Sequence, residues 1–443
     1  MVIASPCTCS TNFVAAAVVW VRPLCAEVAA RATRSLSARS RTLFVHTVGA
    51  TFIGVAGGLL AALFLGSLNW ATTTRTDLDW LVWLLPVGGL VVGFLYHRFG
   101  QPAAGGTSLV LDAAHVPDGD VPARMAPMVW SGSVASHLVG ASVGREGAAV
   151  QIVASVVDGA ARRLGIDRRS RSALLVCAVA AAFGGLFGVP AAGGLFALEV
   201  QRVSRRHLSV LPFAVASSVI AHITARAVGI EHNQLFRTDA LNLDWPHLWR
   251  YVVAGIFFGG VAGVFIAVEC FVKDAFARTI SWAPARPAVG GLCVLGLVAL
   301  ADSRLYLGVS YDLVDSALTG AVGVAAIAFV WKMIFTAVSL GSGFVGGEML
   351  PLFVMGALAG AQFARVTDAS VSLFAALGLV AVFAAASKTP LACIAIGTEL
   401  FGWKGLPAFG IVCIVAVLAG GKRSIYPLSP LARRHGATND VAL

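Results

Sequence analysis

Apolar stretches separated by short polar connections fill most of this 443-residue chain. They lie at about residues 43–66, 79–96, 127–143, 147–157, 173–200, 208–228, 249–272, 287–300, 321–340, 351–363, 371–386, 390–401 and 406–420. A helix needs about 20 apolar residues to cross a bilayer, so several of these stretches are too short to cross alone. The pattern predicts an all-α polytopic membrane protein with many short, broken and tilted helices.

Glycine and proline interrupt the short stretches at matching places in two halves of the chain. Residues of the first half recur 200 positions later: Phe183, Pro190, Ala192 and Glu199 match Phe383, Pro390, Ala392 and Glu399. Glu146 has a similar counterpart in Glu348, which stands 202 positions later. Short, interrupted segments at corresponding places are typical of transporters built from inverted-topology repeats, with the binding site between the repeats.

The same pattern sets the expected domain boundaries. Residues 1–42 are predicted to form a cytoplasmic N-terminal segment. Their apolar run is too short to span a bilayer, and no basic region precedes it as in a signal peptide. The Arg-rich stretch before Leu43 is expected to keep this segment on the cytoplasmic side. Residues 43–427 are predicted to form the transmembrane domain, with repeat one at about 43–228 and repeat two at about 249–427. Residues 428–443 are expected to be a short polar cytoplasmic tail without an appended soluble domain.

Composition supports a membrane protein, with 58% hydrophobic and only 12% charged residues. A soluble domain carries about 25% charged residues. The formal net charge of +10 comes from arginines and lysines that cluster between the apolar stretches. Such clusters mark cytoplasmic loops and contact anionic lipid, so we expect the lipid bilayer and not nucleic acid as the partner.

Cysteine and histidine give no sign of a metal site or a cofactor. The eight cysteines form no framework, and the nine histidines have no metal-ligand spacing. No nucleophile elbow or phosphate-binding loop accompanies them. We therefore predict no catalytic residues, no metal and no cofactor.

Five glutamates lie in or beside the apolar stretches, where an ionised carboxylate is costly and must face protein or water. They are Glu146, Glu199, Glu269, Glu348 and Glu399. Glu146 stands just before a predicted helix start, where a carboxylate meets free N–H groups and the positive end of the helix dipole. An anion competes for the same groups, so Glu146 is a candidate gate; simple helix capping is the alternative.

The other four glutamates have different settings. Glu348 precedes Pro351 at a predicted helix start, which is compatible with a capping role or a functional one. Glu199 and Glu399 stand near predicted helix C-termini, where pairing with backbone or with a basic neighbour such as Arg202 predicts a structural role. Glu269 stands alone at the end of a long apolar run and is interpreted as an interfacial or packing residue.

Several short motifs resemble those of the CLC family of chloride channels and anion/proton antiporters, over about residues 43–427. The family's Gly-Lys/Arg-Glu-Gly motif reads here as residues 144–147. Its Gly-Ser-Gly-Ile-Pro motif corresponds to residues 106–110, and its Gly-x-Phe-x-Pro motif to residues 347–351. The family's anion-coordinating tyrosine corresponds to Tyr426.

The resemblance implies a CLC-type fold, a homodimer with one pore per subunit, and Glu146 as the gating glutamate. Hydroxyl and backbone N–H groups are expected to replace the hydration shell of the anion without a full positive charge. The expected anion-binding residues are Thr107, Ser108, Tyr426, Gly144, Arg145, Gly147 and Met349. Glu348 is the candidate second carboxylate of the proton route.

The fluoride/proton antiporter branch resembles this chain further. Like that branch, the chain lacks the internal glutamate of the proton-coupled chloride antiporters, whose place is taken by Val200. It is also similar to the branch over residues 124–127, 144–151 and 341–348. Departures from the branch stand at Thr107, Val110, Leu350 and Val354.

The leading hypothesis is a multi-pass transporter of a bacterial-type inner membrane that exchanges a small halide for protons, with fluoride favoured over chloride. A passive anion channel of the same fold is the main alternative, because the missing internal glutamate permits it. A cation-coupled solute transporter fits the repeats but not the motifs. An intramembrane enzyme is the remote alternative, since five carboxylates could serve acid–base chemistry.

Overall fold

The computed structural model describes residues 38–100, 105–116, 119–200, 205–230, 245–320, 326–427 and 429. Within those ranges the chain forms sixteen α-helices, short 3-10 turns and a single isolated β-bridge. The predicted all-α class is therefore confirmed. Residues 1–37 of the predicted N-terminal segment, and residue 428 and residues 430–443 of the predicted tail, lie outside the described residues.

The helices fall into two consecutive series of eight. The first series is α2 (Ala38–Asp77), α3 (Leu85–Phe99), α4 (Gly106–His115), α5 (Met125–Val139), α6 (Glu146–Arg163), α7 (Arg168–Phe187), α8 (Pro190–Glu199) and α9 (Leu211–Ala227). The second is α10 (Leu248–Thr279), α11 (Ala285–Ala301), α12 (Tyr311–Thr319), α13 (Ala328–Ser342), α14 (Met349–Thr367), α15 (Val371–Ser387), α16 (Pro390–Phe401) and α17 (Leu406–Ala419). Short 3-10 turns at Asp79–Leu84, Arg205–Val210, Trp245–His247 and Trp403–Gly405 join some of them.

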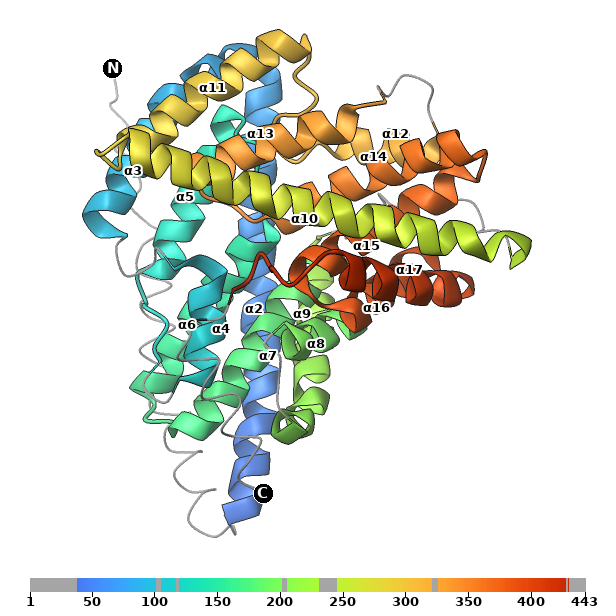
Figure 1. The fold of residues 1–443 in the computed structure, drawn as a ribbon. Helices are drawn as coiled ribbons and strands as arrows, with labels where there is room; N and C mark the ends of the chain where they lie inside the picture. The colour runs from blue at the N-terminus through green and yellow to red at the C-terminus, as the bar shows by residue number, and fades with distance from the viewer. Residues whose placement is uncertain are drawn as a thin grey trace, which may run out of the picture.

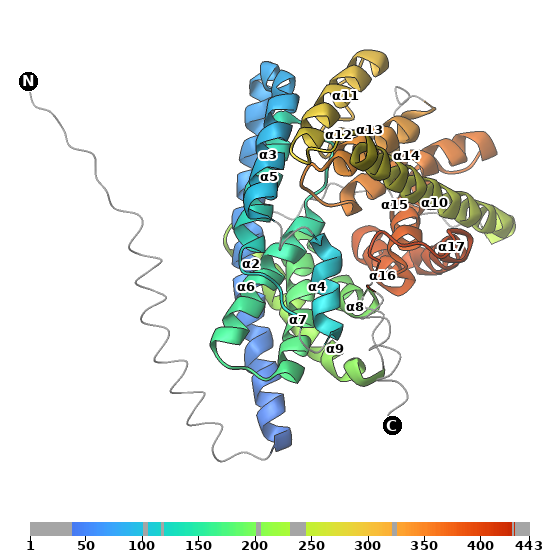
Figure 2. The same ribbon diagram turned by 60° about the vertical axis from the view of Figure 1, so that its left-hand side comes forward.

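The packing of the first series is repeated in the second. Helix α2 packs against α7 and α9, as α10 packs against α15 and α17. In the same way α6 packs on α7 as α14 packs on α15. The two series lie side by side and meet where α3 contacts α11 and where α8 contacts α16 (Figures 1 and 2). The fold is thus two repeats of short and long helices.

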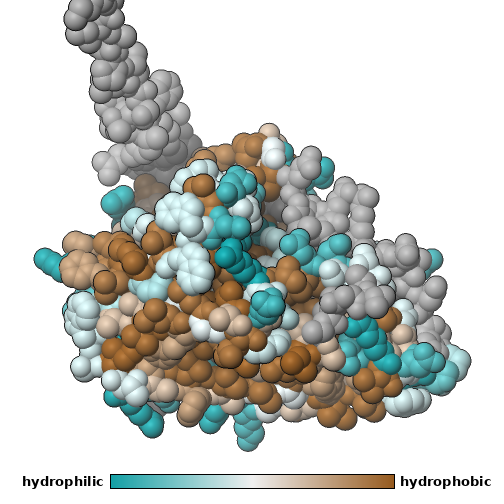
Figure 3. Space-filling view, turned by 90° about the horizontal axis from the view of Figure 1, so that it is seen from above, coloured by the Kyte–Doolittle hydropathy of each residue, from teal (hydrophilic) through white to brown (hydrophobic). Residues whose placement is uncertain are grey.

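Six helical segments are long and apolar enough to cross a membrane: Leu43–Asp77, Asp79–Phe99, Arg168–Phe187, Leu208–Ala227, Leu248–Thr279 and Met349–Thr367. Large apolar side chains on the outer helices are exposed, including Phe52, Trp83 and Phe271. Figure 3 shows broad hydrophobic areas on the face in view. These side chains would meet lipid, whereas α7 and α15 are almost entirely buried inside the protein.

A buried aspartate holds the connections around α4 and α6 together. The Asp158 carboxylate accepts from Arg171 at 2.8 Å and from the Val121 N–H at 3.0 Å, and lies 3.3 Å from the Arg162 Nε. Arg162 and Arg171 also pair with the exposed Asp120 at 3.1 and 2.7 Å. The hydrogen bond from Arg171 lowers the pKa of the Asp120 carboxyl. This network fixes the loop between α4 and α5 onto the start of α7.

Replacing Asp158 by Asn should lower the free energy of unfolding by about 2–3 kcal/mol, because removing one partner of a buried ion pair leaves uncompensated charge. The Arg162 side chain is partly exposed, so water can solvate its charge, and we expect a loss near the lower end of the range for a broken buried ion pair. A lowered melting temperature in detergent is the expected measurement. Asp274→Asn, at an exposed position of α10, is the matched control. Equal melting of the two variants would contradict the assigned role.

Candidate functional site

The two repeats are joined by a backbone bridge between Gly144 and Gly347. The Gly144 N–H donates to the Gly347 carbonyl at 2.7 Å, and the Gly347 N–H donates to the Gly144 carbonyl at 2.8 Å. Helix α6 begins two residues after Gly144, at Glu146, and α14 begins two residues after Gly347, at Met349. The bridge therefore brings two helix N-termini, with their free N–H groups and positive dipole ends, to one place.

Close approach explains the glycines of both motifs. A Cβ on Gly144 would lie 2.8 Å from the Gly347 carbonyl oxygen, and one on Gly347 would lie 2.7 Å from the Gly147 nitrogen. A Cβ on Gly346 would overlap the Val143 side chain. Only glycine allows the two backbones to approach this closely.

The Glu146 carboxylate is buried at this junction, with 3% of the residue exposed. Its Oε2 accepts a hydrogen bond from the Arg145 N–H at 3.2 Å, and its Oε1 lies 3.5 Å from the Arg145 Nε. Within the described residues Oε1 accepts no hydrogen bond. The Arg145 guanidinium in turn stacks over the Tyr311 ring, 5.3 Å from its centroid. The carboxylate is thus folded back onto the N-terminus of its own helix.

A second set of polar side chains lies around Gly147, the residue after Glu146. A Cβ on Gly147 would lie 3.3 Å from the Thr107 Oγ1 and 3.8 Å from the Glu348 Oε2. Thr107, rather than Ser108, is the hydroxyl placed against this glycine. Glu348 thus faces the first repeat, and the candidate anion and proton residues meet at one backbone position.

Gln151 belongs to this group, and no role was predicted for it. Its Nε2 donates to the Thr107 Oγ1 at 3.2 Å. Gln151 stands four residues after Gly147 on α6, so the two share a helix face. That spacing is the signal that could have identified Gln151 from the sequence.

Tyr426 is buried against both repeats. The backbone before it is held by the Ile425 N–H, which donates to the Ala386 carbonyl at 3.0 Å. Its ring lies 6.4 Å from that of Phe196, which stacks on Phe383 at 5.9 Å. Tyr426 also lies close enough to Glu348 and Glu146 to interact with both electrostatically. The predicted anion-binding tyrosine is therefore near the two candidate carboxylates.

Glu199 and Glu399 cap helices of the opposite repeat. Glu199 accepts from the N–H groups of Leu391 and Ala392 at 3.0 and 2.7 Å. Glu399 accepts from the N–H groups of Ala191 and Ala192 at 3.0 and 2.9 Å. Backbone partners were predicted, but not that each glutamate finds them in the other repeat. Arg202, the basic partner considered from the sequence, lies outside the described residues.

Glu269, expected from the sequence to stand alone, has charged neighbours in the structure. It lies close enough to Glu348 to interact with it electrostatically, and Lys273 is near both carboxylates. Glu269 and Lys273 are one helical turn apart on α10, whereas Glu348 starts α14. Helix packing, which the sequence pattern does not reveal, brings them together.

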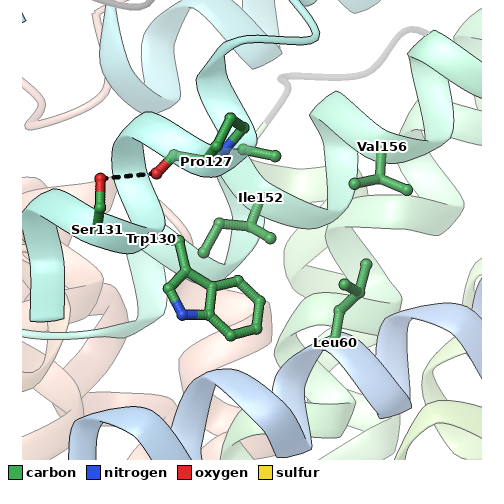
Figure 4. Close-up of a pocket in the computed structure, with 7 residues that line it drawn as sticks. Leu60, Pro127, Trp130, Ser131, Ile152 and Val156 are labelled. Carbon is green, nitrogen blue, oxygen red and sulfur yellow. Dashed lines mark hydrogen bonds between the residues drawn. The ribbon is translucent and has the colours of Figure 1, made fainter. Parts of the chain in front are cut away.

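The pocket drawn in Figure 4 lies elsewhere and has no anion-binding character. It is an open depression of about 350 Å³ between α2, α5 and α6. Its lining is formed by Leu60, Ala126, Pro127, Trp130, Ser131, Ile152 and Val156. The Ser131 hydroxyl is already used, since it donates to the Pro127 carbonyl at 2.8 Å. Among the described residues no group of three His, Cys, Asp or Glu side chains gathers to hold a metal ion.

This site of two converging helix N-termini and a buried carboxylate lies in a chain that is similar to known proteins. A family model described as voltage gated chloride channel matches residues 88–421. This chain belongs to that family, the CLC family. The family resemblance inferred from the motifs is thereby confirmed.

Two curated relatives illustrate the range of the family. A chloride/fluoride channel protein of Pseudomonas syringae pv. tomato is 38% identical over 384 residues, which cover 85% of this chain and 84% of the relative. The H(+)/Cl(-) exchange transporter ClcA of Cronobacter sakazakii is 28% identical over 399 residues, covering 83% of this chain and 84% of the relative.

Solved structures agree with the fold. The crystal structure of a CLC-type fluoride/proton antiporter has a TM-score of 0.83 and 30% identity, covering 90% of this chain and 99% of that one. A slow cyanobacterial Cl-/H+ antiporter has a TM-score of 0.74 and 20% identity, covering 90% of this chain and 98% of that one. The CLC-type fold of inverted-topology repeats is therefore confirmed.

Gly347→Ala should break the bridge between the repeats. The new methyl group would meet the Gly147 nitrogen, and such overpacking costs about 1–3 kcal/mol. We expect a lower melting temperature together with loss of anion flux in liposomes. Gly66→Ala on α2, where a Cβ would meet open space, is the control and should change neither. Normal flux through a well-folded Gly347→Ala protein would contradict the role of the bridge.

Proposed function

We propose that this protein is a CLC-type transporter that exchanges a small halide for protons across a bacterial cell membrane, with Glu146 as its gate. The observation that carries the proposal is the position of the Glu146 carboxylate at the N-terminus of α6, buried and held by the Arg145 N–H. An ionised carboxylate competes with an anion for these N–H groups. A protonated one binds them weakly and leaves, so anion and proton move in alternation.

The anion is proposed to bind between the two helix N-termini. Backbone N–H groups of Arg145, Gly147 and Met349, with hydroxyls of Thr107, Ser108 and Tyr426, would replace its hydration shell. Gly144, whose N–H donates to the Gly347 carbonyl, would hold the two N-termini around the anion. Neutral donors suit a transported ion, because binding must be strong enough for entry and weak enough for release. The Gln151 amide, bonded to Thr107, would orient that hydroxyl toward the path.

Fluoride is the favoured halide. One solved structure that resembles this protein, with 30% sequence identity, is that of a CLC-type fluoride/proton antiporter. The Pseudomonas syringae relative is named a chloride/fluoride channel protein. Val200 stands where chloride antiporters of the family carry the internal glutamate, and Glu348 follows Gly347 as in the fluoride branch. Chloride is the second candidate, since the Cronobacter sakazakii relative is named for proton/chloride exchange.

Glu348 is proposed as the second carboxylate of the proton route. Its Oε2 lies near Gly147, one residue beyond Glu146, while its other neighbours are Glu269 and Lys273. A proton leaving Glu146 would find the next carboxylate across the junction between the repeats. Glu199 is unsuited to the route, because two backbone N–H groups already bind its carboxylate.

A passive anion channel is the second candidate function. Val200 is buried and cannot relay a proton, which favours it. A homodimer with one pore in each subunit, as expected for the family, is proposed for either function. Whether a fluoride gradient drives protons against their own gradient separates exchange from passive conduction.

Glu146→Gln should abolish anion-driven proton movement, because the amide neither ionises nor carries a proton. We expect proton flux to fall by a factor of about 100 or more, in the range of a lost acid–base group. Anion flux should continue, since the neutral side chain leaves the helix N-terminus open. Liposomes with a pH electrode give both rates, and Asp274→Asn is the control. Unchanged proton movement would show that Glu146 is not the gate.

Fluoride efflux from loaded liposomes should exceed chloride efflux by at least about tenfold, a difference of about 1.4 kcal/mol in barrier height. Ion-selective electrodes measure both rates on the same preparation. Equal or faster chloride efflux would contradict fluoride selectivity while leaving halide exchange intact.

A further inference from the structure

Lys332 is a fully buried lysine on α13 that no motif predicted. It is 0% exposed, and its Nζ lies within hydrogen-bond distance of four oxygens, which share its N–H groups. The acceptors are the Ser142 Oγ at 2.9 Å, the Tyr306 carbonyl at 3.1 Å, the Gly308 carbonyl at 2.7 Å and the Ser310 Oγ at 2.8 Å. All four are neutral, and no carboxylate of the described residues pairs with it. Burying an ammonium without a counter-charge is costly, so its position calls for a reason.

One end of this contact set lies next to the gate. Ser142 stands two residues before Gly144, which bridges the repeats, and four before Glu146. Helix α13 holds Ser142 through two further side chains: the Thr336 Oγ1 lies 3.1 Å from the Ser142 Oγ, and the Ser339 Oγ accepts the Ser142 N–H at 3.0 Å. Three side chains of one helix thus fix the residue that leads into the gate motif.

The other end of this contact set lies in the segment just before Tyr311. Gly308 stands three residues before Tyr311 and Ser310 one residue before it. The Arg145 guanidinium stacks on the Tyr311 ring. Gly308 and Ser310 both have left-handed backbones, with φ values of 59° and 63°. Such a conformation is unfavourable for serine and persists only where the surroundings impose it. The bonds from Lys332 to the Gly308 carbonyl and the Ser310 hydroxyl supply that restraint.

We infer that Lys332 is a positioning residue for the gate. It ties the segment that carries Arg145 and Glu146 to the segment that carries Tyr311. The link keeps the Arg145 guanidinium on the Tyr311 ring and its Nε 3.5 Å from the Glu146 Oε1. Without it, Arg145 loses its fixed place, and the carboxylate leaves the helix N-terminus more often without a proton. Anions would then pass without proton exchange. This inference rests on the proposed gating function of Glu146.

The test compares Lys332→Met with Lys332→Gln, each with Glu146 intact and with Glu146→Gln, in liposomes with fluoride and proton electrodes. With Glu146 intact, Lys332→Met should raise the number of fluoride ions moved per proton by about threefold or more. Lys332 and Glu146 are linked through Ser142 and through the Tyr311 segment, and groups in one network of contacts are energetically coupled. Lys332→Gln keeps two donors and should fall between Met and Lys. With Glu146→Gln, Lys332→Met should leave the fluoride rate unchanged, because the gate is already absent.

Ser142→Ala and Ser310→Ala provide a milder test that keeps the lysine. Each removes one acceptor, and each should raise the same ratio in the same direction; these variants decide the matter if Lys332→Met does not fold. An unchanged ratio in folded Lys332→Met, or in both serine variants, would overturn the inference. An equal rise in fluoride rate with Glu146→Gln would also overturn it, since Lys332 would then act independently of the gate. Failure of Glu146→Gln to uncouple protons would instead refute the proposed function itself.

Discussion

Helix N-termini buried at membrane depth are the constraint on which the rest of this structure depends. No water reaches such N–H groups from the lipid, so the protein must supply an acceptor for them. For α6 and α14 the backbone bridge between Gly144 and Gly347 holds the two N-termini together, while the first N–H groups of the helices themselves still need acceptors. That bridge requires glycine on both sides and fixes where the two repeats meet. Gly147 and Glu348 lie at this junction.

Carboxylates accept hydrogen bonds at the buried helix N-termini in two different ways. The difference distinguishes the structural glutamates from the candidate functional one. Glu199 and Glu399 each bind two N–H groups of a helix in the opposite repeat, so their removal would leave both helices unsatisfied. Glu146 accepts from the N–H of Arg145, which directly precedes its own helix, and its Oε1 accepts no hydrogen bond among the described residues. The first arrangement is permanent. The second leaves a carboxylate oxygen without a hydrogen-bond donor, which suits the proposed exchange for an anion.

The repeats share a scaffold, but their chemistry is asymmetric. Glu146 opens α6 and folds back onto its start, whereas Glu348 stands just before α14, makes no side-chain capping hydrogen bond and faces Gly147 of the other repeat. Glu348 has Glu269 and Lys273 as neighbours, while Glu146 has Arg145 and, through it, Tyr311 and Lys332. Pseudo-symmetry therefore brings the two glutamates to one junction, and the differences between the two halves are the basis for the different roles proposed for them.

The sequence alone determined the membrane class, the two-fold repeat and the position of Glu146 at a helix start, because these depend on hydrophobic periodicity and on local glycine and proline chemistry. It also indicated Thr107 and Tyr426 through their motifs. Only the tertiary structure showed that Gln151 binds Thr107, that Glu199 caps α16, and that Lys332 reaches Ser142. Glu199 and Ala392, like Ser142 and Lys332, are more than 180 positions apart in the chain. Contacts of that kind arise from how the repeats pack, and a local pattern carries no record of the packing.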